Sequence, residues 1–354
     1  MLDHVHKLVK RDTIPPQSLI DLLKNTFIGT NGTLYQLLDT EEKIHTLNQP
    51  TFIYLERNEK AIGSFTVCNR EVIIGNSKAP SFYIRYFAVA ELFHGGRSKS
   101  QGKSLLHKYF KELFETSNLN PIAPAHEKIM YWAFIDPDNL RSFNMNTQFG
   151  FQTIGTFETT AFSRVNPKNS TVERAVSGDH DSILASLQTF YQDYQLFSPV
   201  HLFKDDNYFV IRKNGEIVCG IQANPVHWKI KSLPGLSGRL MLKYAPKIPR
   251  IKKLINPENH RFLATEGLFW KPGHEAEVSH LLEGTLAVTR HHSLLIWTDS
   301  AHPILSQLPI KWGFIQRMKK DNSVQIVAKF NGYSNDEVEL IKERPKYMSG
   351  FDMT

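Results

Sequence analysis

The chain has 354 residues, of which 41% are hydrophobic and 22% are charged, and these values exclude a disordered, collagen-like or disulfide-stapled protein. At roughly 100–200 residues per domain, the length predicts two domains. The two cysteines, Cys68 and Cys219, lie in strand-like runs, so we expect buried, unreactive thiols in a reducing compartment. No apolar run suits a signal peptide or a membrane span, and the sequence therefore predicts a cytoplasmic protein without membrane insertion.

The net charge of +7 comes from a single segment. Residues 229–253 contain eight lysines and arginines and no acid, so the rest of the chain is close to neutral, at −1. Pro234, Pro246 and Pro249 interrupt this stretch, which favours a solvated basic loop or a short helical hairpin. A site for an anion or a membrane surface is the functional alternative, and no nucleic-acid partner is predicted.

The first half alternates strand-like and helix-like runs. Alternation from Tyr83 to Val89 predicts a strong strand with Tyr83, Arg85, Phe87 and Val89 on one face. The expected elements are a helix at Leu19–Lys24, strands at Thr51–Glu56, Ala61–Cys68 and Ser81–Val89, a helix at Ser104–Phe114, a strand at Lys128–Ile135, a helix at Asn139–Phe149 and a strand pair at Phe151–Phe162.

The second half repeats this pattern after a linker at Pro167–Ser170. The expected elements are a helix at Asp179–Gln195, a hairpin of Tyr208–Arg212 and Glu216–Ala223, a strand at Arg261–Trp270, a helix at Glu275–Thr289, a strand at Ser293–Thr298, a short helix at Ile304–Leu308, a strand at Val324–Phe330 and a possible helix at Asn335–Lys342. Asp136 and Gly150-Phe151 recur 163 residues later as Asp299 and Gly313-Phe314. We therefore predict an internal duplication, with domains at 1–166 and 170–330, a basic insertion at about 224–260 and a charged tail at 331–354.

A loop of small and basic residues, 97–104, lies between the expected strand Ser81–Val89 and the helix that follows it. Backbone N–H groups at such a helix start, with the positive end of the helix dipole, suit a pyrophosphate. The end of the loop, Gly102-Lys103-Ser104, also fits a Walker A motif, but Arg97 stands where its first glycine is expected. A P-loop-like nucleotide-binding protein therefore stays an alternative.

Downstream of the loop the sequence carries Asn139, Ser142, Asn146 and Gly150-Phe151. This spacing, together with the loop, resembles the GCN5-related N-acetyltransferase superfamily, whose loop reads Q/R-x-x-G-x-G/A and whose helix reads N-x-x-A-x-x-x-Y-x-x-x-G-F. The resemblance implies an α/β fold of two tandem acyl-CoA N-acyltransferase-like domains, each with a mixed, mostly antiparallel sheet flanked by helices. It also implies acetyl-CoA as co-substrate, without a metal, and a small-molecule or peptide amine as acceptor.

The resemblance also implies a binding site on residues of the first half. The loop would hold the CoA phosphates, and the pantetheine arm would lie along a strand edge, near the start of the next helix. The implied cofactor-binding residues are Phe87, Ala88, Val89, Arg97, Lys99, Ser100, Gln101, Gly102, Lys103, Ser104, Asn139 and Ser142.

In that superfamily an amine attacks the thioester directly in a ternary complex, and the tyrosine of the helix motif serves as the acid. Asn146 stands at that position, and an amide cannot act as a general acid at neutral pH. The expected catalytic residues are Glu91, His94 and Asn146, with Asp136 as a further candidate base. The substitution at Asn146 leaves a catalytically silent acyl-CoA sensor as an alternative.

The second half has no phosphate loop. Trp270 to His274 leads directly into a helix, and Pro272 removes a backbone donor, so we expect a degenerate, non-binding copy. The spacing of His274, His280 and His291-His292 matches no metal motif, and no metal site is predicted. The acceptor and the oligomeric state are not predicted by the sequence.

Overall fold

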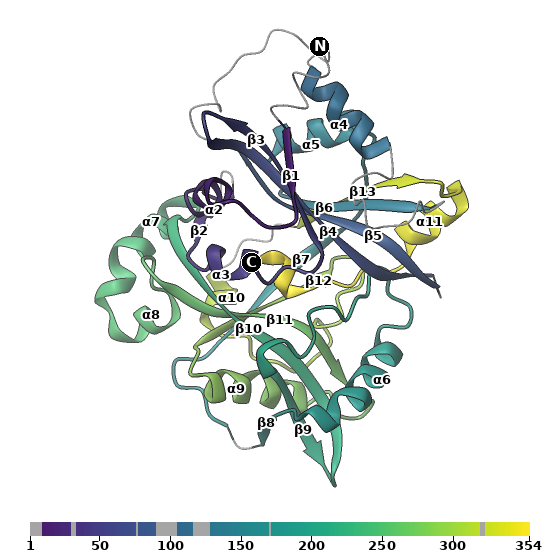
Figure 1. The fold of residues 1–354 in the computed structure, drawn as a ribbon. Helices are drawn as coiled ribbons and strands as arrows, with labels where there is room; N and C mark the ends of the chain where they lie inside the picture. The colour runs from purple at the N-terminus through teal and green to yellow at the C-terminus, as the bar shows by residue number, and fades with distance from the viewer. Residues whose placement is uncertain are drawn as a thin grey trace.

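The computed structural model describes residues 9–29, 33–75, 77–89, 105–115, 128–169, 171–318 and 323–354 (Figure 1). The elements of the first half are β1 (Val9–Asp12), α2 (Gln17–Lys24), β2 (Leu34–Leu37), α3 (Thr40–Ile44), β3 (Pro50–Arg57), β4 (Lys60–Ile74), β5 (Ser77–Val89), α4 (Leu105–Glu115), β6 (Ile129–Ile135), α5 (Leu140–Gln148) and β7 (Gln152–Ser163). Those of the second half are β8 (Val172–Arg174), η2 (Ser177–Asp179), α6 (His180–Phe190), η3 (Lys204–Asp206), β9 (Tyr208–Lys213), β10 (Glu216–Ser232), α7 (Gly235–Tyr244), η4 (Ala245–Lys247), α8 (Pro249–Leu254), β11 (His260–Trp270), α9 (Glu277–Thr289), β12 (Ser293–Asp299), α10 (Phe314–Met318) and β13 (Val324–Asn331). The chain then continues through α11 (Asn335–Glu343) and η5 (Gly350–Met353).

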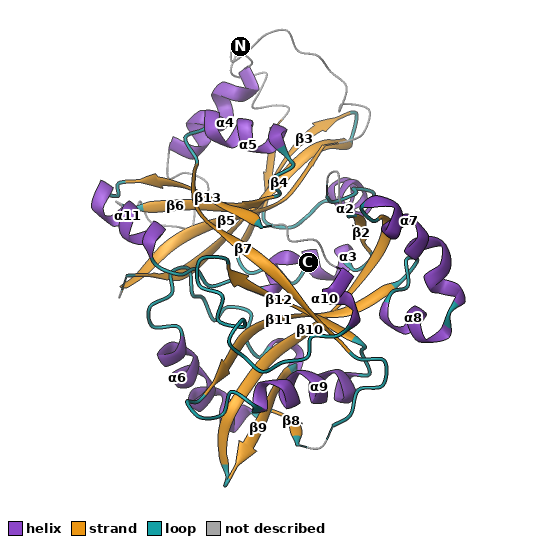
Figure 2. Ribbon diagram, turned by 180° about the vertical axis from the view of Figure 1, so that it is seen from behind, coloured by secondary structure: helices purple, strands orange, loops and turns teal. Residues whose placement is uncertain are grey.

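The strands form one 13-stranded sheet in the order β1-β3-β4-β5-β6-β13-β7-β12-β11-β10-β9-β8, with β2 paired to β10. The same run of strands occurs twice in this order: β1 and β3 to β6 of the first half correspond to β8 and β9 to β12 of the second half. At the centre of the sheet the last strand of each half pairs with the other half: β13 pairs with β6, and β7 pairs with β12. Figure 2 shows β7 running between the two halves. The duplicated, mostly antiparallel fold that the sequence predicted is therefore present.

Three expected elements differ from the structure. Phe151–Phe162 forms the single strand β7 instead of a strand pair, because its first part pairs with β13 and its second part with β12. The helix expected at Asp179–Gln195 ends at Phe190, and Gln195 instead bridges to Lys346. The helix expected at Ile304–Leu308 is a series of turns, with short-range hydrogen bonds such as Ser306 N–H to the Pro303 carbonyl.

From Gly235 on, the basic segment forms the short helical hairpin α7 and α8, one of the two expected forms, whereas Lys229 and Lys231 belong to strand β10, which continues beyond its expected end at Ala223. Cys68 and Cys219 are both buried and free, as the sequence predicted. The expected alternation of side chains between the two faces of the sheet is wrong for β5 beyond Arg85, because a bulge there adds one β5 residue opposite β4. Tyr83 and Ala88 consequently share a face and pack in the same core.

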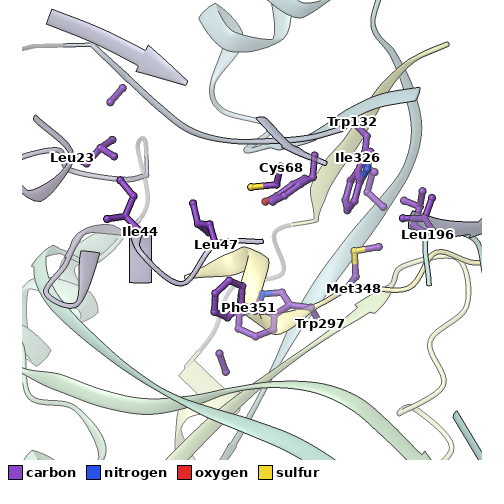
Figure 3. Close-up of a cluster of buried hydrophobic side chains, with 14 of the residues drawn as sticks. Leu23, Ile44, Leu47, Cys68, Trp132, Leu196, Trp297, Ile326, Met348 and Phe351 are labelled. Carbon is purple, nitrogen blue, oxygen red and sulfur yellow. The ribbon is translucent and has the colours of Figure 1, made fainter. Parts of the chain in front are cut away.

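A single core joins the two halves. It contains Cys68 and Trp132 from the first half and Trp297 from the second, together with Met348 and Phe351 from the end of the chain (Figure 3). Although residues 331–354 have a charged composition, residues 346–352 are all buried. The end of the chain is thus part of the central core, and Figure 1 places the C-terminus between the halves.

Candidate functional site

The site lies where strands β5 and β6 separate. They pair in parallel only from Ser81 with Met130 to Ile84 with Ala133. Beyond Ile84 the edge of β5 that faces β6 pairs with no strand in the described part of the chain, while the opposite edge stays bonded to β4. The bulge at this point gives Tyr86 a φ of 54°, a left-handed conformation that is uncommon for a residue other than glycine. The structure thus presents an edge of β5 that pairs with no strand of the described chain at the separation of two strands, in the stretch that includes Phe87 and Ala88.

A cavity of about 770 Å³ opens beside this edge of β5. Three consecutive residues of β6 line the cavity. Ala133 and Ile135 belong to the core beneath α4 and α5, and Phe134 packs against the core between the halves. Neighbouring residues of a strand point to opposite faces of the sheet. The cavity therefore reaches both faces of the sheet through the gap between β5 and β6.

The two sides of the cavity differ in chemistry. Toward α4 and α5 the wall is mainly apolar, with Ile53, Phe65, Phe110, Phe114, Met145 and Phe149. Toward the second half the wall contains Tyr35 and Trp228, whose rings stack with centroids 3.7 Å apart. One side therefore suits a hydrocarbon chain, and the other offers aromatic and polar groups.

Three polar atoms of residues that line the cavity are buried and have no hydrogen-bond partner in the described structure: the hydroxyl oxygen of Tyr86, the indole nitrogen of Trp228 and Nε of Arg85. Burial raises the pKa of Tyr86 above its usual value, so its hydroxyl stays protonated and can donate. Burial, with the charge of Asp136 as the second cause, also raises the pKa of Tyr35. Unpartnered buried polar atoms cost stability, and these atoms lie within the wall of the cavity rather than on its open surface.

The structure brings together all the predicted site residues that it describes. Asn139, Ser142 and Asn146 of the α5 region line the same cavity as Phe87 to Val89. The Asn139 side chain caps α5, since its Oδ1 accepts from the Ser142 N–H at 3.1 Å. The Asn146 side-chain amide donates to the Ser142 carbonyl at 2.8 Å, so this group is held by the helix backbone.

The remaining predicted residues lie outside the described part of the chain. These are Glu91, His94, Arg97, Lys99, Ser100, Gln101, Gly102, Lys103 and Ser104. Their roles stay predictions. The described carboxylates that line the cavity include Asp136, which lies just beyond the last residue of β6 and whose Oδ1 accepts from the Asp138 N–H at 2.9 Å.

The corresponding separation in the second half is filled. Strands β11 and β12 pair in parallel only at Leu263 with Leu294 and Ala264 with Leu295. The end of the chain occupies the gap beyond them: Gly267 N–H donates to the Tyr347 hydroxyl at 3.0 Å, and Lys346 N–H donates to Asp299 at 2.9 Å. Only about 20 Å³ remains open there. The second copy therefore has no room for a ligand comparable to the one that the first copy can hold.

The same terminal segment also forms a wall of the open cavity, through Asp352, Met353 and Thr354. Asp352 accepts two hydrogen bonds from Arg70, at 2.7 and 2.8 Å, and Arg85 donates to the backbone oxygens of Phe351 and Thr354. Burial raises the pKa of Asp352 and the charge of Arg70 lowers it, with a net decrease. An ionised Asp352 that is already paired is a structural anion, and it is a poor proton acceptor.

Several residues of the site were missed by the sequence-based reasoning. Tyr35 and Trp228 come from strands 193 residues apart and meet only because β2 pairs with β10. Tyr86 was seen as an ordinary strand residue, and no local signal marks the bulge that turns it. For Asp352, a carboxylate in a charged stretch looks like a solvated side chain, so its partner Arg70 could not be inferred.

No family model and no curated protein matches the sequence. Solved structures do match: N-myristoyltransferase of Saccharomyces cerevisiae with bound myristoyl-CoA and inhibitors aligns with a TM-score of 0.57 and 11% identity, over 97% of this chain and 86% of that one. A second structure of that enzyme, with bound myristoyl-CoA, gives a TM-score of 0.58 and 10% identity, over 96% of this chain and 84% of that one. The chain has the fold of N-myristoyltransferase. This is a tandem form of the GCN5-related N-acetyltransferase fold, so the expected fold class and family resemblance are confirmed at the level of structure.

Proposed function

We propose that this chain is an N-acyltransferase that moves an acyl group from acyl-CoA to an amine. The observation that carries the proposal is the cavity of about 770 Å³ beside the edge of β5 that separates from β6. Ligand pockets in proteins range from about 300 to 1,000 Å³, so the cavity has the size of a ligand site. The edge of β5 at Phe87 and Ala88 suits the amides of a pantetheine arm, and Val89, Asn139 and Ser142 line the same cavity. Residues 97–104 are the proposed phosphate cradle.

We further propose that the acyl chain is longer than acetyl. The wall toward α4 and α5 is lined by phenylalanines, and burying each CH₂ of a chain against such a wall contributes about 0.8 kcal/mol. An acetyl group would leave most of this surface without contacts. The structures that share this fold were solved with myristoyl-CoA, which supports the same direction. Acetyl-CoA, the donor that the sequence resemblance implied, is thus the shortest acyl-CoA to test.

The reaction forms a bond between the amine nitrogen and the thioester carbonyl carbon, while the bond from that carbon to sulfur breaks. The nitrogen loses one proton and the CoA sulfur gains one. Asp136 is the proposed acceptor of the amine proton among the described residues, with Glu91 and His94 as the further candidates. We assign the Tyr86 hydroxyl as the donor to the departing sulfur, since Tyr86 lines the cavity and its raised pKa keeps the hydroxyl protonated. In this proposal the Tyr86 hydroxyl takes the role of the motif tyrosine that Asn146 replaces. The Asn146 amide can only orient neighbouring groups.

The test is a thermal-shift series with acetyl-, octanoyl- and myristoyl-CoA, followed by CoA release across amines, amino acids and peptides. We expect the melting temperature to rise most with a longer chain. Met145→Trp, which fills the apolar side of the cavity, is expected to remove that shift. Gln148→Trp places the same ring on the exposed face of the same helix and is the matched control. If no acyl-CoA shifts the melting temperature at millimolar concentration, the proposal is wrong.

A catalytically silent acyl-CoA-binding module is the second candidate, favoured by the engaged amide at Asn146. It predicts the same thermal shifts but no CoA release with any amine. The fold does not favour the P-loop alternative: β5 and β6, on either side of the loop and α4, pair in parallel, but the other neighbour of β5 is the antiparallel strand β4, and the sheet as a whole is mostly antiparallel.

A further inference from the structure

We propose that the α7–α8 hairpin is a docking face for an anionic membrane surface. This inference goes beyond the acyl transfer proposed above and does not depend on it. The hairpin consists of residues 235–254, and both views place it at the outer edge of the molecule, next to α2 and β2 (Figures 1 and 2).

The outward face of α7 combines apolar and basic side chains. Leu236, Leu240 and Tyr244 recur every four residues, which places them along one side of the helix. Their side chains are 78%, 57% and 45% exposed, and Ile248, just beyond the helix, is 45% exposed. Arg239 and Lys243 fall on the same side by their spacing and are also exposed.

The inward face anchors the hairpin to the protein. Met241 and Leu242 pack against a small core made of Ile230, Leu254 and Ile255. Gly238 lies so close to Leu233 that an added Cβ would approach its backbone oxygen to 2.7 Å. The opposite side of α7 is therefore already packed against the protein, and the exposed leucines lie on the face that this packing leaves in solvent.

The cations of the hairpin have neutral partners at most: Lys253 donates to Asn166 Oδ1 at 3.3 Å, and Lys243 and Lys247 lie over the Tyr244 ring. Arg239, Lys243, Lys247, Arg250, Lys252 and Lys253 are all exposed, and no ion pair joins any of them to a carboxylate in the described part of the chain. In the neighbouring strand Lys229 does pair, with Glu258 at 3.0 Å. Lysines and arginines without ion pairs, around exposed aliphatic side chains, leave a positive charge that an anionic partner can match.

This arrangement fits a lipid surface better than a nucleic acid. Leucine and isoleucine can enter the acyl boundary of a membrane while lysine and arginine stems extend to the phosphates. A nucleic-acid groove offers phosphates but little apolar surface for Leu236 and Leu240. No helix in the described ranges is long and apolar enough to cross a membrane, so the proposed contact is peripheral.

The hairpin is also close to the cavity along the chain. Strand β10 carries Trp228 in the cavity wall and ends at Ser232, three residues before α7 begins. A membrane held against α7 would therefore lie on the side of the molecule where β2 and β10 border the cavity.

The test is sedimentation of the full chain with vesicles of phosphatidylcholine alone and with about one third phosphatidylserine. We expect binding only to the anionic vesicles, weakening as salt rises. Lys243→Gln/Lys247→Gln/Lys252→Gln should lower the partition coefficient on the order of 100-fold, at about tenfold per 1.4 kcal/mol and roughly 1 kcal/mol per cation. Leu236→Ser/Leu240→Ser should also weaken binding, at unchanged net charge.

The matched control is Lys10→Gln/Arg57→Gln/Lys60→Gln, which removes the same charge from exposed positions on β1 and the β3–β4 hairpin. It should bind as the unchanged protein does. Equal loss in this control would show that net charge alone drives binding, and it would overturn the proposal. Unchanged binding in the leucine variant, or preferential binding to duplex DNA over vesicles, would also overturn it. None of these readouts requires acyl-CoA, so a failure here leaves the proposed acyl transfer untouched.

Discussion

Arg70 and Asp352 form a buried ion pair with two hydrogen bonds, of 2.7 and 2.8 Å, between residues 282 apart in the sequence. Arg70 lies on β4, and Asp352 lies in the terminal segment that fills the second-half gap and borders the first-half cavity. His201 Nε2 is 3.4 Å from the same guanidinium, which can only donate, so this nitrogen carries no proton. Burial lowers the pKa of His201 to about 3, consistent with a neutral ring. The Arg70–Asp352 pair therefore holds the terminal segment between the gap of the second half and the cavity of the first half.

Breaking this pair should destabilise the fold. Asp352→Ala leaves a buried guanidinium without its anion, and we expect the free energy of unfolding to fall by about 3–5 kcal/mol in a urea titration. The control is Glu71→Ala, which removes an equally short ion pair, 2.7 Å to Lys78, at the surface. Its effect should be at most about 1 kcal/mol. Similar losses in both variants would contradict the structural role of Asp352.

Gly350 is the contact that lets the terminal segment enter the second-half gap. A Cβ at this position would lie 2.3 Å from the backbone oxygen of Thr265, so Gly350→Ala must displace the segment. We expect a loss of about 1–3 kcal/mol in the free energy of unfolding, with weaker acyl-CoA binding because the same segment borders the cavity. Gly178→Ala, where an added Cβ meets nothing within 4 Å, is the control. An unaffected Gly350→Ala variant would show that the segment is not held tightly.

Glu266 should make stability depend on pH. Burial raises its pKa from 4.5 to about 7, although the Ser349 hydroxyl and the Asn224 amide donate to it. A raised carboxyl pKa means that the folded state binds the proton more tightly. The contribution is therefore complete below about pH 4.5 and is lost as the pH rises to about 7.

Chemical unfolding of the unchanged protein and of Glu266→Gln across this range measures the effect. The stability of the unchanged protein relative to the variant should fall by about 3 kcal/mol from the acidic end to neutrality. His201, whose pKa is lowered, acts in the opposite direction but is common to both proteins. A difference that does not vary with pH would mean that folding does not raise the pKa of Glu266.

Asp136 and Tyr86 should affect catalysis, and they can be separated by kinetics. Asp136→Asn is expected to lower kcat by about 10²-fold or more with little change in the KM for acyl-CoA, because it removes a proton acceptor. Asp138→Asn changes a neighbouring carboxylate in the same wall and should stay near the unchanged rate. If the two variants lose activity equally, Asp136 has no special role.

Tyr86→Phe removes a buried hydroxyl that has no partner, so its stability should stay the same or rise. A drop in kcat by about tenfold or more would then reflect the lost donor rather than unfolding. The measurement is kcat together with the melting temperature. Full activity with raised stability would show that the hydroxyl does not serve the departing sulfur.

The sequence was sufficient for most elements of the first half and for part of the site. The family resemblance implied site roles for Asn139, Ser142 and Asn146, and the structure has them lining one cavity together with Phe87 to Val89. Local patterns suffice in such a case, because helical and strand periodicities determine which residues share a face. The division into domains at residues 166–170 stays a prediction, since the sheet is continuous across it.

What the sequence determined by itself is a duplicated α/β chain with one basic hairpin, because periodicity, turns and charge are properties of neighbouring residues. Only the tertiary structure decided that β7 and β13 change places, that Tyr35 stacks on Trp228, and that Asp352 reaches Arg70. It also decided that the terminal segment fills one gap and leaves the other open. Each of these depends on contacts between residues far apart in the chain, which are selected by packing and by the cost of burying unpaired polar groups.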